Sequence, residues 1–338
     1  MEKGLSLIMP VYNASSFIRR TLEYVVRQTY SNYELLVVDD GSTDETLQIL
    51  KEFEKRYENV RVICQKNQGC GIARNHAIDC ATKEYVTFMD HDDYIGDNYL
   101  EILMQNVEHY DLLVSGSYAI MRSDFETKGV SAYFKKNIQA EIRVDNISDM
   151  ATQFEKIDFP PSNLSVVWGK VFRRQIIVEN NIKFLPNPAE DHIFSYTYLY
   201  YVSSVRQINW AGYYHVQTSD SLGNTHQYIA DLDTIHVMEQ LQRRLIEKFS
   251  IHSEGYLSNL RWRAMNRFTS LAYKGYHQDT RLGRKERMAV WNSIRNDKLF
   301  LSIKKMDMLG FRRFILTWYI CRMRIYYLLD YVIKATVP

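Results

Sequence analysis

Residues Tyr85–Asp93 of this 338-residue chain read YVTFMDHDD, an apolar run of five residues followed directly by a cluster of acids. Such a short apolar run predicts a buried strand, so the acids would stand where the strand leaves its sheet. Three carboxylates within four residues repel one another, and a divalent cation would relieve the repulsion. Two carboxylates leave most of a cation's coordination positions open, so we expect substrate phosphates to fill the rest. The other interpretation is a solvated loop in which Asp92 or Asp93 caps the next helix.

The chain before this run alternates between predicted strands and helices. The expected strands are 5–9, 33–38 and 60–64, and the expected helices are 17–27, 43–57 and 71–81. This alternation predicts parallel strands with helices on both faces, and ligands then bind at the carboxyl ends of the strands. Polar clusters follow each strand, at 10–13, 39–40, 68–75 and 90–93. The expected N-caps of the first two helices are Ser15 or Ser16 and Ser42 or Thr43, and Asp44 and Glu45 are expected in the first turn of the second.

The composition is that of a folded protein, with 46% hydrophobic residues, 15 Phe, 25 Tyr and only six Pro. The four cysteines form no CxxC pair, which favours reduced thiols in a cytosol over a zinc site. The N-terminus has no apolar stretch of the length that a secretory signal needs. The first strand-to-helix turn lacks G-x-G-x-x-G, and a P-loop is absent too, so dinucleotide and P-loop folds are disfavoured.

Charge is spread unevenly along the chain. Residues 243–338 hold 20 Lys and Arg against 7 Asp and Glu, whereas the total is 42 against 40. Residues 311–333 mix aromatic and aliphatic side chains with four Arg and one Asp, too many charges for a membrane span. A helix lying in the membrane interface fits this composition, and an ordinary packed helix or a homo-oligomer contact are the alternatives. We expect no nucleic-acid partner.

Four motifs in this order resemble those of family 2 glycosyltransferases: PVYN at 10–13, DDGSTD at 39–44, NQGCGIARN at 67–75 and DHDD at 90–93. Downstream, WGKVFRR at 168–174 and EDHIF at 190–194 are similar to acceptor-side motifs of the same bacterial enzymes. The resemblance ends near residue 222. It implies an α/β protein of the GT-A fold, a Rossmann-like, nucleotide-binding mixed sheet flanked by helices. It also implies a nucleotide-diphosphate sugar donor, a divalent metal and inversion at the anomeric carbon.

The implied organisation is a catalytic domain at 1–222 and a mainly helical, basic region at 223–338. The catalytic domain would comprise a donor half, 1–115, and an acceptor half, 116–222.

The resemblance assigns the donor and metal residues. Tyr12 would stack on the nucleobase, and Asp39 would accept the imide N–H of uracil, which favours a UDP-sugar. Asp92 and Asp90 would bind Mn²⁺ or Mg²⁺. His215 departs from the family pattern, in which many relatives carry Tyr and Arg near this point; it would complete the metal shell or meet the diphosphate. The full set expected at the donor is Pro10, Tyr12, Asn13, Asp39, Asp40, Gly69, Arg74, Asp90 and His215. The competing interpretations are a turn or N-cap role for Asp39 and Asp40, a surface ion pair for Arg74 and a structural histidine at 215.

The acceptor side is expected around the second group of motifs. Asp191 matches the family's general base, with Glu190 as the neighbouring candidate. Trp168 would line the sugar and acceptor pocket. The competing interpretations are a plain helix N-cap for Asp191 and core packing for Trp168.

The sequence thus predicts an inverting, hexosyltransferase-type enzyme. It would move sugar from a UDP-sugar to a hydroxyl of a lipid-linked oligosaccharide or a growing surface polysaccharide of the capsule, O-antigen, exopolysaccharide or teichoic acid type. The expected location is the cytoplasm, with peripheral contact at the inner face of the cell membrane. The alternative is a non-catalytic nucleotide-sugar binder or scaffold with the same fold.

Overall fold

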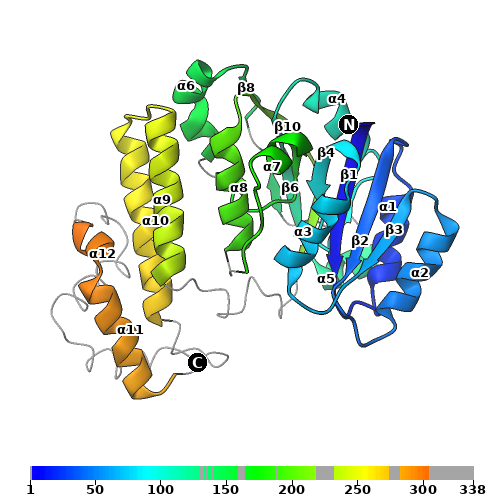
Figure 1. Cartoon of the computed structure of the whole chain (residues 1–338), viewed down its shortest axis with the longest axis horizontal. Helices are drawn as coiled ribbons and strands as arrows, with labels where there is room; N and C mark the ends of the chain where they lie inside the picture. The colour runs from blue at the N-terminus through cyan, green and yellow to red at the C-terminus, as the bar shows by residue number, and fades with distance from the viewer. Residues whose placement is uncertain are drawn as a thin grey trace. The chain divides into compact units, whose positions relative to one another are not determined.

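The computed structural model describes residues 2–128, 133, 135–138, 140–158, 164–186, 189–217, 232–273 and 282–303 (Figure 1). The chain forms two compact units, one of residues 1–186 with 190–218 and the other of residues 187–189 with 219–338. Every strand of the described residues lies in the first unit. In the described part of the chain, no helix has both the length and the apolar character needed to cross a membrane.

The first unit is built on a mixed sheet of ten strands in the order β3-β2-β1-β4-β9-β6-β10-β5, with β7 paired to β6 and β8 to β10. Strands β1 to β4 pair in parallel, whereas β9 runs antiparallel to both β4 and β6. β6 and β10 are again parallel. The bounds are β1 Glu2–Val11, β2 Tyr33–Asp39, β3 Val60–Cys64, β4 Lys83–Phe88, β5 Tyr94–Ile95, β6 Leu112–Met121, β7 Lys135–Asn137, β8 Ile142–Val144, β9 Lys170–Arg173 and β10 Val205–Gln217.

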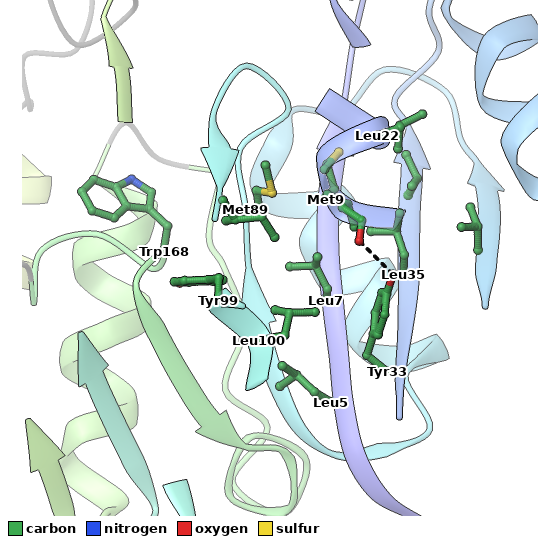
Figure 2. Packing of buried hydrophobic residues seen from close by; sticks show 14 of the residues in the cluster. Leu5, Leu7, Met9, Leu22, Tyr33, Leu35, Met89, Tyr99, Leu100 and Trp168 are labelled. Atoms are coloured by element: carbon green, nitrogen blue, oxygen red, sulfur yellow. Dashed lines mark hydrogen bonds between the residues drawn. The ribbon is translucent and has the colours of Figure 1, made fainter. Parts of the chain in front are cut away.

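Helices cover both faces of the parallel half of this sheet, as expected. Leu7 of β1 and Leu35 of β2 share a core cluster with residues of α1, α2 and α4, and Figure 2 shows Leu22 of α1 and Leu100 of α4 packed there. α3 packs on β1 and β2 through buried residues outside that cluster. The bounds are α1 Ile18–Val26, α2 Thr46–Arg56, α3 Cys70–Cys80, α4 Tyr99–Val107, α5 Arg122–Lys128, α6 Ile147–Asp158, α7 Arg174–Glu179 and α8 Glu190–Tyr201.

The expected N-caps are wrong. α1 begins at Ile18 after Phe17, without a capping side chain. α2 begins at Thr46, later than expected, so Asp44 precedes the helix and accepts from the N–H of Thr46 at 3.0 Å. The carboxylate of Asp44 also accepts from the N–H of Ser15 at 3.1 Å. It therefore ties the loop after β1 to the loop after β2, which a local capping rule does not anticipate.

The second unit is helical in its described residues. α9 (Leu232–Lys248), α10 (Glu254–Tyr273), α11 (Arg284–Asn296) and α12 (Lys298–Ser302) close around a core that contains Trp291. Asp297 begins α12 by accepting from Phe300 N at 3.0 Å, and it also meets Nε2 of His236 at 2.7 Å. The helical C-terminal region is therefore confirmed, while the proposed membrane-surface segment 311–333 lies outside the described residues.

Candidate active site

The loops after β1 and β2 are fastened to one another at the carboxyl edge of the sheet. Asn13 accepts from the N–H of Thr43 at 2.8 Å, and the N–H of Asn13 donates to Ser42 Oγ at 3.0 Å. Asn13 has a φ of 46°, in the left-handed region that asparagine tolerates better than most residues. The same turn leaves the ring of Tyr12 exposed, with 43% of the residue accessible. An aromatic face therefore stands free beside the end of β2.

The two acids that end β2 have different surroundings although both are buried. Asp40 accepts three hydrogen bonds, from Gln65 Nε2 at 2.8 Å, Gln68 N at 2.9 Å and Gly69 N at 2.8 Å. These bonds shape the loop that leads into α3, where Gly69 has a φ of 90°. By contrast, Oδ1 of Asp39 is buried without a hydrogen-bond partner among the described residues. A buried acceptor of this kind is costly unless a ligand supplies a donor.

Arg74 of α3 is the centre of the site. Its guanidinium donates to Asp90 at 2.7 Å, to Asp191 at 2.7 Å and to Glu190 at 2.9 Å, and only 4% of its side chain is exposed. Burial alone would lower the pKa of Arg74, but Asp191 and Asp90 raise it overall, so the group stays charged. The structure therefore places Arg74 among carboxylates and not on the protein surface. It connects Asp90, in the loop after β4, to Glu190 and Asp191 at the start of α8.

Asp191 is held from two sides. Its Oδ1 accepts from Arg74, and its Oδ2 accepts from the N–H of Val167 at 3.4 Å. Burial raises the pKa of Asp191 to about 6, against the lowering effect of Arg74. The carboxylate is thus ionised at neutral pH yet has a higher proton affinity than an exposed aspartate. These are the properties that a general base needs.

The three acids after β4 separate into two kinds. The side chains of Asp90 and Asp92 are about one-third exposed, at 32% and 33%, and Asp92 lies 3.7 Å from Arg122. Asp93 is fully buried and accepts from Tyr213 Oη at 2.6 Å and from Val216 N at 2.8 Å. Asp93 therefore anchors β10, and Asp90 and Asp92 are the acids that a ligand can reach.

These two carboxylates suit a hard divalent cation. Among the described residues, no group of three or more His, Cys, Asp and Glu side chains is arranged to hold a metal by itself. A cation at Asp90 and Asp92 would therefore take its other oxygen ligands from a bound diphosphate and water.

An aromatic stack stands beside the acids. The ring of Trp168 lies parallel to that of Tyr213, with centroids 4.8 Å apart, and it also stacks on His215 at 5.4 Å. Nδ1 of His215 is 3.3 Å from the carboxylate of Asp93. Burial would lower the pKa of His215, but Asp93 raises it to about 9. The raised pKa favours the imidazolium form, which adds positive charge near Asp90 and Asp92.

Two residues of the site were missing from the sequence expectations. Tyr213 donates to Asp93 and accepts from the N–H of Asp90 at 3.2 Å, and Lys170 is wholly buried near Asp191. Lys170 lies in the motif WGKVFRR, and Tyr213 stands two residues before His215. The partners of Tyr213 are 120 and 123 residues away in the chain, and the burial of Lys170 depends on the packed sheet, so the local pattern shows neither.

The chain matches the sequence model of glycosyl transferase family 2 over residues 6–174, half of its length, and it belongs to that family. It is 33% identical over 182 residues to glycosyltransferase GlyA of Streptococcus pneumoniae, which covers 52% of this chain and 25% of that protein. It is 32% identical over 200 residues to the poly(ribitol-phosphate) beta-glucosyltransferase of Bacillus spizizenii, which covers 56% of this chain and 28% of that protein. The match thus spans about a quarter of the length of each relative.

Among solved structures, residues 1–349 of S. aureus TarS in complex with UDP-GlcNAc superpose with a TM-score of 0.65. The superposition covers 96% of this chain and 92% of that one at 20% sequence identity. This likeness confirms the GT-A type of fold for the chain.

Proposed function

We propose that this protein is an inverting glycosyltransferase that uses a UDP-sugar and a divalent cation. The observation that carries the proposal is the set of contacts around Arg74. Its guanidinium keeps Asp191 close to Asp90, the acid that follows β4. One guanidinium contacts both Asp90 and Asp191 at 2.7 Å. A donor held at Asp90 would therefore have a carboxylate with raised proton affinity close by. A nucleotide-sugar scaffold has no need of a buried base of this kind.

The nucleotide would lie across the ends of β1 and β2. Tyr12 offers an exposed ring for stacking, and the unpartnered Oδ1 of Asp39 needs a donor. Uracil has an imide N–H that would satisfy Asp39, whereas cytosine has none. Pro10 and Asn13 shape the loop after β1, and Asp40 with Gly69 shapes the loop between β3 and α3. TarS, which shares this fold, binds UDP-GlcNAc in its crystal structure.

The diphosphate would lie between Asp90, Asp92 and His215. Asp92 and Asp90 would hold Mn²⁺ or Mg²⁺ together with the phosphate oxygens. When bound, the cation supplies charge neutralisation for the departing diphosphate. His215 adds a second positive charge, held in place by Asp93 and by the ring of Trp168.

The reaction is then one direct displacement. The acceptor hydroxyl oxygen forms a bond to the anomeric carbon as the bond from that carbon to the diphosphate oxygen breaks. The hydroxyl proton passes to the carboxylate of Asp191, and the UDP leaves with the bonding electron pair. Attack opposite the leaving group inverts the anomeric centre. Glu190 and Trp168 would take part on the acceptor side.

The acceptor we propose is a hydroxyl of a cell-surface polysaccharide or of its lipid-linked precursor. The support is the named activity of the Bacillus spizizenii relative, which glucosylates poly(ribitol-phosphate). An anionic polymer or membrane would also suit the excess of 20 Lys and Arg over 7 Asp and Glu in residues 243–338. Such an enzyme would work at the inner face of the cell membrane.

The decisive experiment is Asp191→Asn, an almost isosteric change. A thermal-shift screen of nucleotide sugars with Mn²⁺ first identifies the donor. Asp191→Asn should then bind UDP as tightly as the wild type and lose roughly 10²–10⁴ in kcat, the usual contribution of a positioned base. Glu190→Gln is the matched control, since Glu190 also contacts Arg74, and it should lose much less. Unchanged turnover in Asp191→Asn would remove the base assignment, and a wild type that binds UDP but never transfers sugar would favour the scaffold.

A further inference from the structure

Lys170, the first residue of β9, is a cationic side chain with no exposed surface. Its ammonium donates to the carbonyl oxygen of Val166 and lies 3.5 Å from that of Trp168. Burial takes water away from the side-chain nitrogen of Lys170, and the two backbone carbonyls replace part of that hydration. A side chain kept in this position is therefore expected to do more than fill space.

The carbonyls that Lys170 contacts belong to a short loop, residues 166–168, whose three residues contact α8, Asp191 and the aromatic stack in turn. Val166 O also accepts from Ser195 Oγ of α8 at 3.3 Å. Val167 N donates to Oδ2 of Asp191. Trp168 carries the ring that stacks on Tyr213 and His215. The loop thus reaches the base and the aromatic stack at the same time.

The start of β9 is fixed around this loop as well. Gly169, with a φ of 72°, accepts through its carbonyl from Ser115 N at 2.8 Å, and the carbonyl of Lys170 accepts from Thr87 Oγ1 at 2.7 Å. These hydrogen bonds restrain the backbone at Lys170. The ammonium is therefore well placed to bind the carbonyls of the loop.

Lys170 and Asp191 also interact through their charges. Burial lowers the pKa of Lys170 to about 7, and the nearby charge of Asp191 opposes that lowering. Asp191 thus accepts a direct hydrogen bond from Arg74, and its charge also acts on Lys170 through space.

We propose that Lys170 is a positioning residue for sugar transfer. By holding the carbonyls of Val166 and Trp168, its ammonium keeps the N–H of Val167 on Asp191 and the Trp168 ring on its stack. Lys170 touches neither donor nor acceptor in this role and acts through Asp191. The inference rests on the proposed function of Asp191 as the base.

The test is Lys170→Met in the full chain, with Lys55→Met, at an exposed position of α2, as the matched control. Lys170→Met should keep UDP affinity and the KM for the donor within about threefold and lose roughly 10- to 100-fold in kcat, the scale of a small misplacement of reacting groups. Its near-UV circular dichroism should change, because the Trp168 ring loses its anchor. Lys170→Gln, which keeps an N–H donor, should recover part of the rate and serves if the Met variant does not fold.

The double variant Lys170→Met with Asp191→Asn separates positioning from a general structural role. If Lys170 acts through Asp191, the double variant should be no slower than Asp191→Asn alone, because the two losses are not independent. Additive losses, or a Lys170→Met enzyme with wild-type kcat, would overturn the inference. The proposed function fails separately, if Asp191→Asn alone retains full activity.

Discussion

Replacing Arg74 by Met should reveal how strongly the site depends on one buried cation. The guanidinium contacts Asp90, Asp191 and Glu190 within 2.7–2.9 Å, and 4% of its side chain is exposed. Methionine fills a similar volume but leaves the three carboxylates facing one another without a counter-charge. Removing one partner of a buried ion pair costs roughly 3–5 kcal/mol, and we expect the free energy of unfolding to fall by that amount.

The decrease in the free energy of unfolding should also depend on pH, and the pKa of Asp191 decides at which pH the decrease is larger. Burial raises the pKa of Asp191 to about 6 while Arg74 lowers it, so removing Arg74 should raise this pKa further. A raised carboxyl pKa in the folded state means that ionisation destabilises the fold, and that penalty is absent below the unfolded pKa of about 3.9. The free energy of unfolding that Arg74→Met loses relative to the wild type should therefore be larger at pH 8 than at pH 5.

Urea unfolding of both proteins in the presence of a chelator, followed by circular dichroism at the two pH values, measures this deficit. The matched control is Arg19→Met, which breaks an ion pair to Glu52 whose side chains are 51% and 48% exposed. That pair should be worth less than about 1 kcal/mol. A deficit for Arg74→Met no larger than for Arg19→Met, or one that does not change with pH, would refute the electrostatic account of the cluster.

Three further outcomes are expected. Asp92→Asn should keep the fold, but Mn²⁺ should no longer raise the melting temperature of the protein above that with UDP alone, because one of the two reachable carboxylates is neutralised. An unchanged effect of Mn²⁺ would exclude Asp92 as a ligand. The wild-type kcat should fall as pH decreases through about 6, where burial places the pKa of Asp191, and Glu190→Gln should show a similar acid limb. Converting the four Arg of residues 311–333 to Gln should weaken sedimentation with anionic vesicles, each charge being worth about 1 kcal/mol, without changing UDP binding; equal sedimentation would leave the packed helix or the homo-oligomer contact.

Much of the fold of residues 1–115 could be predicted from local pattern. Apolar runs flanked by polar clusters predicted the parallel strands, with β3 at the expected 60–64 and β1, β2 and β4 within a few residues of their bounds. A short run of apolar residues bounded by polar ones is typical of a buried strand, so these strands can be predicted from the local sequence. The helix caps were wrong because Asp44 bonds across to Ser15, and a contact between two loops has no local signature.

By itself the sequence determined the alternation of strands and helices, the family and the identity of the acids at the sheet edge. Only the tertiary structure decided which of those acids act together. Arg74 and Asp191 are separated by 117 residues, and Asp93 and Tyr213 by 120, yet each pair lies within hydrogen-bonding distance. The reason is physical: Asp90, Asp92 and Asp93 stand in one acidic motif but differ in burial and partners, so that Asp93 anchors β10 while Asp90 and Asp92 stay accessible.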